Sequence, residues 1–365
     1  MIADLATAGG PSSLLQAQDV RVHFPIRKGF LKRVVGHVRA VDGISLAIRP
    51  GETLSLVGES GCGKTTLGQA LVRVIEPKDG RILYHRGEGD PVDLAHLGEA
   101  ALRPYRSEIR MIFQDPFASL NPRRRVIDII GEGLRNFGVT DEAEVEARVA
   151  ALLGKVGLRP EYMSRYPYAF SGGERQRIGI ARALAPRPKL VVADECVSAL
   201  DVSVRAQTLN LLQDLQEEFD LTYLFISHDL SVVEYISDRV AVMYAGRIVE
   251  LAETEPLFAR PRHPYTAALL AAVPRPDPRM ARATRRLRLQ GEVADPANRP
   301  SGCAFHPRCP FATDLCRVED PAPRVVSGHQ VACHHAETLD LKGVMADAVR
   351  QERGFSPGRD VVHGR

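Results

Sequence analysis

The stretch from Gly58 to Thr66 constrains the fold of this chain more than any other part of its sequence. It follows the apolar run Thr53 to Val57 and precedes a helix-compatible run from Leu67 to Val74. A strand, a glycine-containing loop and a helix in this order are typical of a phosphate-binding loop. Glycines without a Cβ atom let backbone N–H groups close around phosphate oxygens. An ordinary glycine-rich turn is the alternative.

Several residues of this loop are candidates for contact with a bound nucleotide. Lys64 is expected to reach the β- and γ-phosphates, and Thr65 to offer its hydroxyl to a bridging Mg²⁺ ion. The first amides of the following helix add further donors. The predicted nucleotide contacts are Gly58, Ser60, Gly61, Cys62, Gly63, Lys64, Thr65 and Thr66.

The composition is that of a globular protein of roughly two domains, with 365 residues of which 44% are hydrophobic. The longest apolar run, Ala267 to Val273, is far shorter than the roughly 20 residues that a bilayer crossing needs. Met1 to Ser13 lacks the features of an export signal, so we expect a cytoplasmic protein whose six cysteines form no structural disulfides. A net charge of +3 gives no general case for nucleic-acid binding.

The N-terminal part of the chain predicts two strands. Residues 15–24 alternate well enough for an edge strand, and Val38 to Ile48 has strand character, whereas Pro25 to Gly36 is expected to be a loop insertion. Phe24, at the end of the first strand, is a candidate platform for stacking an adenine ring. A half-buried strand aromatic is an equally good interpretation.

Two later strands end in residues suited to phosphate chemistry. Leu190 to Ala193 is followed by Asp194 and Glu195. Asp194 is expected to hold Mg²⁺, and Glu195 to polarise the water that attacks the γ-phosphate. The strand Thr222 to Ile226 leads to His228, which we expect to donate to a γ-phosphate oxygen, although a structural histidine is the alternative.

A glutamine and a second glycine pair complete the set of candidates. An apolar strand from Arg110 ends in Gln114 and breaks at Pro116. Gln114 is expected to ligate the metal ion and to move with the next segment, although a surface glutamine is the alternative. Ser171, Gly172 and Gly173 precede the helical run from Glu174, and form a second anion site or an empty helix cap. One nucleotide does not need two such sites unless the second serves a nucleotide held by another copy.

These motifs together resemble the ATP-binding subunits of ABC transporters. The resemblance covers residues 14 to about 258 and includes the phosphate loop, Gln114, Ser171 to Glu174, Asp194 with Glu195, the turn Ser198 to Asp201, and His228. Gln114 to Pro122 and His263 to Thr266 are similar to the dipeptide/oligopeptide importers, in particular the subunit usually written with a final F. Glu174 stands where many relatives have glutamine, and Cys196 where proline is usual.

The resemblance implies an α/β fold: a P-loop NTPase cassette with a mixed sheet core, a helical subdomain, an antiparallel β subdomain and a small Cys-rich C-terminal extension. The implied boundaries are an N-terminal tail over 1–13, the nucleotide-binding domain over 14–258, the extension over 259–339 and a tail over 340–365. Glu195, His228 and Gln114 would be catalytic. Asp201 joins the nucleotide-binding residues.

The same resemblance implies a function. Two cassettes would pair head to tail, with each ATP between Lys64 and Thr65 of one and Ser171 and Gly173 of the other. Hydrolysis would then drive import of dipeptides or oligopeptides, or alternatively of nickel chelates or glutathione. Implied partners are a sibling ATP-binding subunit, two transmembrane permeases at the cytoplasmic face of the inner membrane, and an extracytoplasmic substrate-binding protein, with no nucleic acid. A soluble ABC ATPase would need a long coiled coil or two cassettes, and a P-loop kinase or GTPase leaves Ser171 to Glu174 unexplained.

Four cysteines near the C-terminus need an explanation of their own. Cys303, Cys309, Cys316 and Cys333 are separated by five, six and sixteen residues, which lack the short spacing favoured by structural zinc. An iron–sulfur cluster accepts four thiolates at wider spacing. Zinc and plain buried thiols remain alternatives, while the resemblance to peptide importers favours a [4Fe–4S] cluster. His306, His334 and His335 are possible substitute ligands.

Overall fold

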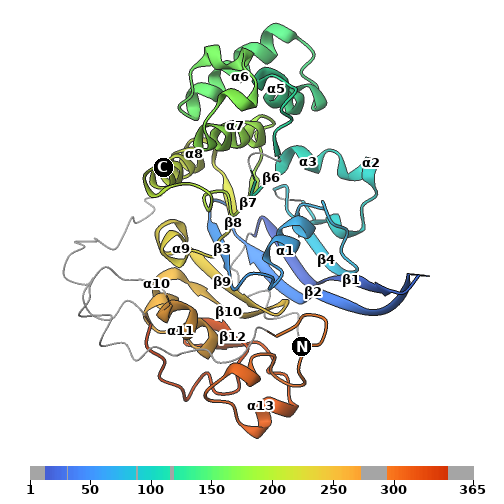
Figure 1. Cartoon of the computed structure of the whole chain (residues 1–365), viewed down its shortest axis with the longest axis vertical. Helices are drawn as coiled ribbons and strands as arrows, with labels where there is room; N and C mark the ends of the chain where they lie inside the picture. The colour runs from blue at the N-terminus through green and yellow to red at the C-terminus, as the bar shows by residue number, and fades with distance from the viewer. Residues whose placement is uncertain (1–12, 31, 88, 116–118, 273–293, 344–365) are drawn as a thin grey trace, which may run out of the picture.

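The computed structural model describes residues 13–30, 32–87, 89–115, 119–272 and 294–343. A central sheet with the strand order β11-β12-β10-β9-β3-β8-β7-β6 runs through the middle of the molecule (Figure 1). Its neighbours from β9 to β6 pair in parallel, whereas β10, β12 and β11 pair antiparallel. The strands are β3 (Thr53–Val57), β6 (Ile109–Ile112), β7 (Leu190–Asp194), β8 (Thr222–Ile226), β9 (Arg239–Tyr244), β10 (Arg247–Glu253), β11 (Arg324–Val326) and β12 (His329–Val331).

Helices pack around this sheet and form a separate layer at one end. α5, α6 and α7 lie at the top of Figure 1, beyond β6 and β7. The longer helices are α1 (Lys64–Leu71), α5 (Val126–Asn136), α6 (Glu142–Lys155), α7 (Gly172–Leu184), α8 (Val202–Phe219), α9 (Leu230–Ile236), α10 (Thr254–Ala259) and α11 (Pro264–Ala271). The shorter ones are α2 (Glu99–Leu102), α3 (Tyr105–Glu108), α13 (Asp314–Val318) and the 3₁₀ turns Leu94–His96, Pro160–Ser164, Pro167–Ala169 and His306–Arg308.

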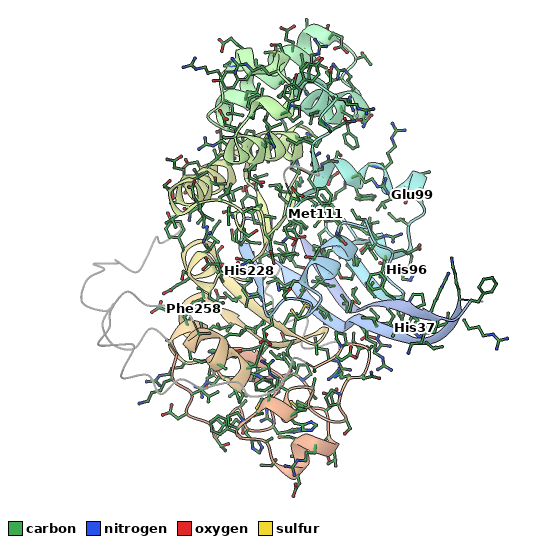
Figure 2. The ribbon with its side chains drawn as sticks, in the orientation of Figure 1. His37, His96, Glu99, Met111, His228 and Phe258 are labelled. Atoms are coloured by element: carbon green, nitrogen blue, oxygen red, sulfur yellow. The ribbon has the colours of Figure 1, made fainter. Side chains whose placement is uncertain are left out.

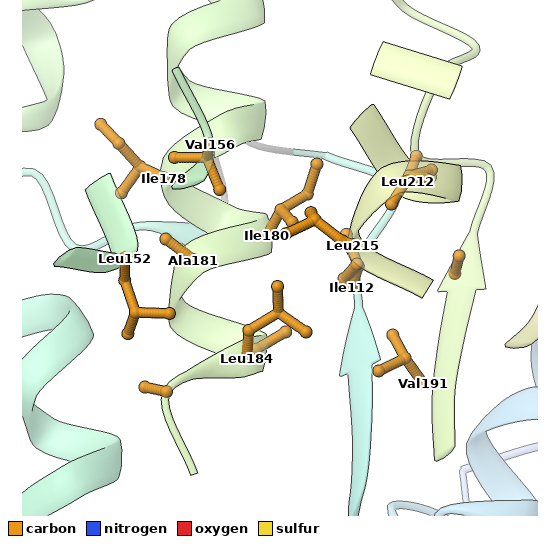
Figure 3. Close-up of a cluster of buried hydrophobic side chains, with 14 of the residues drawn as sticks. Ile112, Leu152, Val156, Ile178, Ile180, Ala181, Leu184, Val191, Leu212 and Leu215 are labelled. Atoms are coloured by element: carbon orange, nitrogen blue, oxygen red, sulfur yellow. The ribbon is translucent and has the colours of Figure 1, made fainter. Parts of the chain in front are cut away.

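Side chains of the central strands alternate between two hydrophobic cores. On β7, Val191 and Ala193 belong to one core and Leu190 and Val192 to the other, because successive side chains of a strand point to opposite faces. A strand buried on both faces is largely apolar, which explains why β3, β7 and β8 could be predicted from the sequence. Figure 3 shows the first core, where the sheet residues Ile112 and Val191 lie among Ile180, Leu184, Leu212 and Leu215 of α7 and α8.

A second, antiparallel sheet has the order β2-β1-β4-β5. Its strands are β1 (Leu15–Lys28), β2 (Arg33–Ile48), β4 (Asp79–Tyr84) and β5 (Val92–Asp93). The prediction of a loop from Pro25 to Gly36 is wrong, because β1 and β2 continue as one long hairpin that projects from the molecule beside His37 (Figure 2). Beyond Arg21, β1 pairs with β2 alone, so this part of β1 is an edge strand, in which proline is tolerated.

The predicted architecture of a mixed sheet, a helical layer and an antiparallel sheet is confirmed. The C-terminal segment, residues 294–343, folds beneath β10 and α11 at the bottom of Figure 1. It is continuous with the central sheet, since β12 pairs with β10 through Glu250 and Val331. The predicted domain boundaries stay predictions. Parts of three of the segments discussed above, residues 1–12, 273–293 and 344–365, lie outside the described residues.

Candidate nucleotide-binding site

The candidate site lies where four parallel strands end. β3 leads into the phosphate loop, β6 leads toward Gln114, β7 ends at Asp194, and β8 leads to His228. Because these strands are parallel neighbours, their carboxyl ends meet at one edge of the sheet, which is where ligands bind in open α/β sheets. The fold therefore gathers the candidate residues that were scattered along the sequence.

Two glycines of the phosphate loop have no room for a side chain. Both have positive φ, 153° at Gly58 and 105° at Gly63. A Cβ atom at Gly58 would lie 2.2 Å from the carbonyl oxygen of Met243, and one at Gly63 would lie 2.0 Å from that of Ala40. The loop is thus packed directly against the backbones of β9 and β2, as a close phosphate cradle requires.

Lys64 begins α1 and folds back over the loop. Its ammonium donates to the carbonyl oxygens of Gly58 at 2.8 Å and Glu59 at 3.1 Å, and the residue is buried. The charge is therefore held at the centre of the loop. This is the position from which a lysine can bind phosphate oxygens.

Thr65 and Asp194 form the predicted metal-ligating pair. The Thr65 hydroxyl donates to a carboxylate oxygen of Asp194 at 3.0 Å. Burial raises the pKa of Asp194 to about 6, an effect that neighbouring Glu195 adds to, while the Thr65 hydrogen bond and Lys64 oppose it. A buried carboxylate with a raised pKa gains from a nearby cation, so this pair fits Mg²⁺ by its donor chemistry.

Glu195 is the meeting point of the three predicted catalytic side chains. Its carboxylate accepts a hydrogen bond from the Gln114 amide at 2.9 Å and lies 3.3 Å from Nδ1 of His228. The Glu195 side chain is 15% exposed and the His228 side chain 57% exposed. A largely enclosed carboxylate beside an open histidine can polarise a water molecule that enters from solvent.

The backbone around Glu195 is fixed on both sides. Its N–H donates to the carbonyl oxygen of Ile226 at 2.9 Å, and its own carbonyl oxygen accepts from the Ser198 hydroxyl at 2.8 Å. The following turn ends at Asp201, whose side chain caps α8 by accepting from the N–H of Val204 at 3.0 Å. Asp201 is therefore a helix cap, and its predicted contact with nucleotide stays a prediction.

Ser171 caps α7 and is not brought to the phosphate loop of the same chain. Its hydroxyl and the N–H of Ser171 both contact the Glu174 carboxylate at 2.8 Å, which forms a capping box and lowers the pKa of Glu174. Within the described ranges, no hydrogen bond joins residues 58–66 to residues 171–173. Gly173 packs against α8, since a Cβ there would meet Val204 at 2.7 Å.

Phe24 lies on the hairpin that borders the loop. It pairs with Val38 across the strands and is 41% exposed. Ala40, which backs onto Gly63, lies two residues beyond Val38 on the same strand. Phe24 is thus exposed on the strand pair that contacts the phosphate loop through Ala40, and adenine stacking stays a prediction.

Of two cavities near the parallel strands, the smaller one is lined by candidate site residues and the larger one is not. One of about 350 Å³ is lined by Gly58, Ser198 and His228, beside the loop and the carboxyl ends of the strands. A wider one of about 620 Å³ lies among Gly51 and Thr222 at the opposite ends of β3 and β8. None of the predicted nucleotide contacts or catalytic residues lines the wider cavity.

The four C-terminal cysteines line one small cavity together with Phe305, His306, Phe311, His334 and His335. Burial raises the pKa of Cys309 to about 11 and that of Cys333 to about 12, and the neighbouring cysteines add to both effects. The thiols of Cys309 and Cys333 therefore stay protonated near neutral pH. However, no group of three or more His, Cys, Asp or Glu side chains in the described part of the chain has an arrangement that could hold a metal ion.

Sequence reasoning missed two residues that contact the phosphate loop. Tyr265 on α11 and Arg308 in the C-terminal segment both bind Glu59. Tyr265 drew attention only as part of a family resemblance, and Arg308 carries no local signal, because its partner lies 249 positions away in the chain.

Comparison with known families extends this picture. The ABC transporter family matches residues 41–198, and the family described as "Oligopeptide/dipeptide transporter, C-terminal region" matches residues 249–316. Among the described residues, none of the helices has both the length and the apolar character needed to cross a membrane.

Individual relatives agree with the family matches. The oligopeptide transport ATP-binding protein AppF of Bacillus subtilis (strain 168) is 50% identical over 330 residues, covering 90% of this chain and 99% of AppF. The probable peptide ABC transporter ATP-binding protein y4tS of Sinorhizobium fredii (strain NBRC 101917 / NGR234) is 54% identical, covering 88% of this chain and 90% of that protein. The solved structure of cbiO1 from Clostridium perfringens, part of the ABC transporter complex cbiONQ, matches with a TM-score of 0.57 and 26% identity over 68% of this chain and 91% of cbiO1. This chain therefore belongs to the ABC transporter family, as an ATP-hydrolysing subunit that carries the C-terminal region of the oligopeptide/dipeptide transporters.

Proposed function

We propose that this chain supplies the energy for import of dipeptides or oligopeptides by an ABC transporter. One observation carries the substrate class: residues 249–316 match the C-terminal region of oligopeptide/dipeptide transporters. The names of AppF and y4tS, each at least 50% identical to this chain, support the same substrate class. Nickel chelates and glutathione are the alternative cargoes, and the choice between cargoes is made by other subunits.

The geometry at the sheet edge supports particular roles in hydrolysis. Lys64 and the loop amides bind the phosphates of ATP, and Phe24 stacks on its adenine. Thr65, Asp194 and Gln114 would hold Mg²⁺, which would supply positive charge to neutralise the phosphates. Glu195 polarises the attacking water from its position beside Gln114 and His228.

The position of Ser171 supports a paired arrangement. Ser171, Gly172 and Gly173 begin α7 but make no hydrogen bond to the described phosphate loop of their own chain. In a head-to-tail pair with a sibling subunit, the start of α7, together with Asp201, faces the nucleotide of its partner. The γ-phosphate then holds the pair closed, and its release removes the differential affinity for the closed state.

The remaining partners follow from the proposed transport. Two transmembrane permeases bind this chain at the cytoplasmic face of the inner membrane and respond to opening and closing of the pair. An extracytoplasmic substrate-binding protein delivers the peptide. Because cbiO1 is itself part of the ABC transporter complex cbiONQ, the similarity of this chain to cbiO1 supports such an assembly.

The test is transport by the reconstituted complex. The chain is co-expressed with the permeases and the second ATP-binding subunit of the proposed complex and placed in proteoliposomes. The binding protein and a labelled dipeptide are then supplied. We expect ATP-dependent peptide uptake that Glu195→Gln abolishes. ATP-dependent uptake of a nickel chelate or glutathione, with no uptake of any peptide, would contradict the proposed cargo.

We also propose that Cys303, Cys309, Cys316 and Cys333 hold a [4Fe–4S] cluster, with zinc as the alternative. The shared cavity and the mutual electrostatic effect of the thiols support a common site. A bound cation would displace the protons of these thiols and cross-link a segment that has little core of its own. The four cysteine side chains do not form a closed coordination sphere as they stand. Binding of a cluster or of zinc therefore requires these side chains to move closer together.

Metal analysis of the full chain, purified without oxygen, tests the cluster. We expect iron and acid-labile sulfide in wild type and in Cys196→Ala, whose thiol is buried elsewhere, but not in Cys333→Ser. Stoichiometric zinc without iron would assign zinc in its place. Absence of both metals would leave the cysteines as buried thiols.

A further inference from the structure

Glu59 joins the phosphate loop to the C-terminal part of the chain. Its carbonyl oxygen accepts from the Lys64 ammonium at 3.1 Å. Its N–H donates to the hydroxyl of Tyr265 at 2.9 Å, and its two carboxylate oxygens accept from the guanidinium of Arg308 at 2.6 and 2.9 Å. One loop residue therefore contacts both the phosphate-binding lysine and two side chains from beyond residue 258.

The pair between Glu59 and Arg308 has the features of a strong interaction. Both nitrogens of the guanidinium fork are used, and the side chains are only 7% exposed for Arg308 and 25% exposed for Glu59. Bidentate, charge-assisted hydrogen bonds are short and directional, and exclusion of water strengthens them. The pair therefore differs from the exposed ion pairs on the surface of the molecule, which contribute little to stability.

The position of Arg308 is set by its own segment. Arg308 ends the 3₁₀ turn His306–Arg308, and its N–H donates to the carbonyl oxygen of Phe305 at 3.0 Å. Phe305 is buried and its ring centroid lies 5.4 Å from that of Tyr265. The N–H of Cys303 donates to the carbonyl oxygen of Cys316 at 2.9 Å, which closes the segment into a compact unit. The guanidinium thus reaches Glu59 only when residues 303–316 are folded.

Arg308 reduces the electrostatic repulsion between Glu59 and a phosphate bound in the loop. Glu59 places a negative charge within a loop that surrounds anionic phosphates, and like charges at such short range repel. Arg308 neutralises the charge of Glu59, while the Tyr265 hydroxyl holds the backbone N–H of Glu59. A phosphate loop that contains an unpaired carboxylate would bind a triphosphate less tightly.

We propose that Arg308 and Tyr265 are positioning residues of the nucleotide site, so that ATP affinity depends on the folded state of residues 303–316. The inference rests on nucleotide binding at the phosphate loop. It goes beyond the proposed transport by placing control of that binding in the C-terminal segment. Three cysteines that line the small cavity, Cys303, Cys309 and Cys316, lie within residues 303–316. A ligand that orders these cysteines would therefore also order Arg308.

The experiment measures binding of Mg·ATP to the full chain by calorimetry, together with the KM and kcat of hydrolysis. We expect Arg308→Gln to weaken ATP binding about 3- to 30-fold, within the range seen for residues that act on a site through a neighbour. The KM should rise by a similar factor with a smaller change in kcat, since the loop binds ground and transition states alike. Arg317→Gln, on α13 in the same segment but paired with Asp314 at the surface, is the matched control and should bind as wild type does.

A double-mutant cycle separates electrostatic positioning from general damage. In a chain that already carries Glu59→Gln, Arg308→Gln should change ATP affinity by less than about threefold, because no carboxylate remains to be neutralised. The proposal would be overturned if Arg308→Gln lowered ATP affinity by the same factor in the wild-type and Glu59→Gln backgrounds. Wild-type ATP affinity in Arg308→Gln alone would also overturn it.

Two further variants guard against misfolding. If Arg308→Gln does not fold, Arg308→Lys keeps the charge and loses the fork, and should give an intermediate affinity. Tyr265→Phe should also weaken binding, because the N–H of Glu59 loses its acceptor. Wild-type affinity in both variants would overturn the proposal. Failure of the wild-type chain to bind ATP would overturn the nucleotide site itself, and this inference with it.

Discussion

Glu195 has a left-handed backbone conformation, with φ of 44°, at the point where β7 ends. Residues other than glycine rarely adopt this conformation, and it is held where the surroundings fix it and function uses it. Here, hydrogen bonds from Ser198 and to Ile226 hold the backbone, and the carboxylate faces both Gln114 and His228. The strained residue is the one that the proposed mechanism needs to place accurately.

Replacement of Glu195 by glutamine keeps the shape of the side chain and removes its charge. We expect ATP hydrolysis to fall by about 10²–10⁴-fold, the usual contribution of a general base, while ATP still binds. Phosphate release measures the first quantity and equilibrium binding the second. Glu217→Gln, on the exposed side of α8, is the control. Near-normal hydrolysis in Glu195→Gln would remove Glu195 from this role.

Two glycine-to-alanine replacements should have opposite outcomes. At Gly63 the new Cβ would lie 2.0 Å from the carbonyl oxygen of Ala40, in a conformation with φ of 105°. We expect Gly63→Ala to destabilise the chain by about 2 kcal/mol or more and to abolish ATP binding, because backbone atoms must move. Gly154→Ala, where a Cβ meets nothing within 4 Å on α6, should be neutral or stabilise the helix by up to about 1 kcal/mol. Chemical unfolding of both variants checks the contrast.

At the scale of elements, the local sequence pattern predicts the buried strands, whereas the outer half of the β1–β2 hairpin depends on pairing between strands. The predicted strands Thr53–Val57 and Thr222–Ile226 are confirmed residue for residue, because a strand buried on both faces is largely apolar. The outer half of the hairpin was missed, since Arg27 and Lys28 are strand residues only by pairing with Val34 and Arg33. Contacts between distant segments, such as Glu59 with Arg308, leave no periodic signal at all.

The start of α7 has two roles that a single substitution can separate. Ser171→Ala removes a capping box, which should cost about 1 kcal/mol of stability. If Ser171 also contacts the nucleotide of a partner subunit, hydrolysis by the assembled pair should fall much more than stability does. Asp141→Ala is the matched control, because Asp141 caps α6 by accepting from the N–H of Ala143 at 3.1 Å, away from the site. Equal ATPase activity in the two assembled variants would leave Ser171 with the cap alone.

At the scale of the whole molecule, the contacts of one buried carboxylate link the C-terminal segment to the central sheet. Glu250 on β10 is fully buried and accepts from the N–H groups of Arg262 and His263 at 2.7 and 3.0 Å. It also lies 2.7 Å from Nδ1 of His329 on β12. One side chain therefore joins the sheet, the start of α11 and the last hairpin, so that stability of the segment is coupled to that of the cassette.

His263 makes this junction sensitive to acid. Burial lowers the pKa of His263 from about 6.5 to about 4, against the opposing effect of Glu250, and its Nδ1 accepts from the N–H of Tyr265 at 3.1 Å. Between these two pH values the unfolded chain binds a proton that the folded chain does not, so lowering the pH favours unfolding. Above about pH 7.5 both states are essentially neutral at this residue and it contributes almost no pH dependence.

We therefore expect the free energy of unfolding to drop by about 1–2 kcal/mol between about pH 7.5 and pH 5.5 through His263 alone. His263→Asn keeps an acceptor at the start of α11 and cannot titrate, so it should lose stability at all pH values but show a shallower pH dependence. His37→Asn, on the exposed hairpin, should keep the wild-type dependence. Urea unfolding at both pH values measures the difference. An unchanged pH dependence in His263→Asn would show that the acid sensitivity arises at another group.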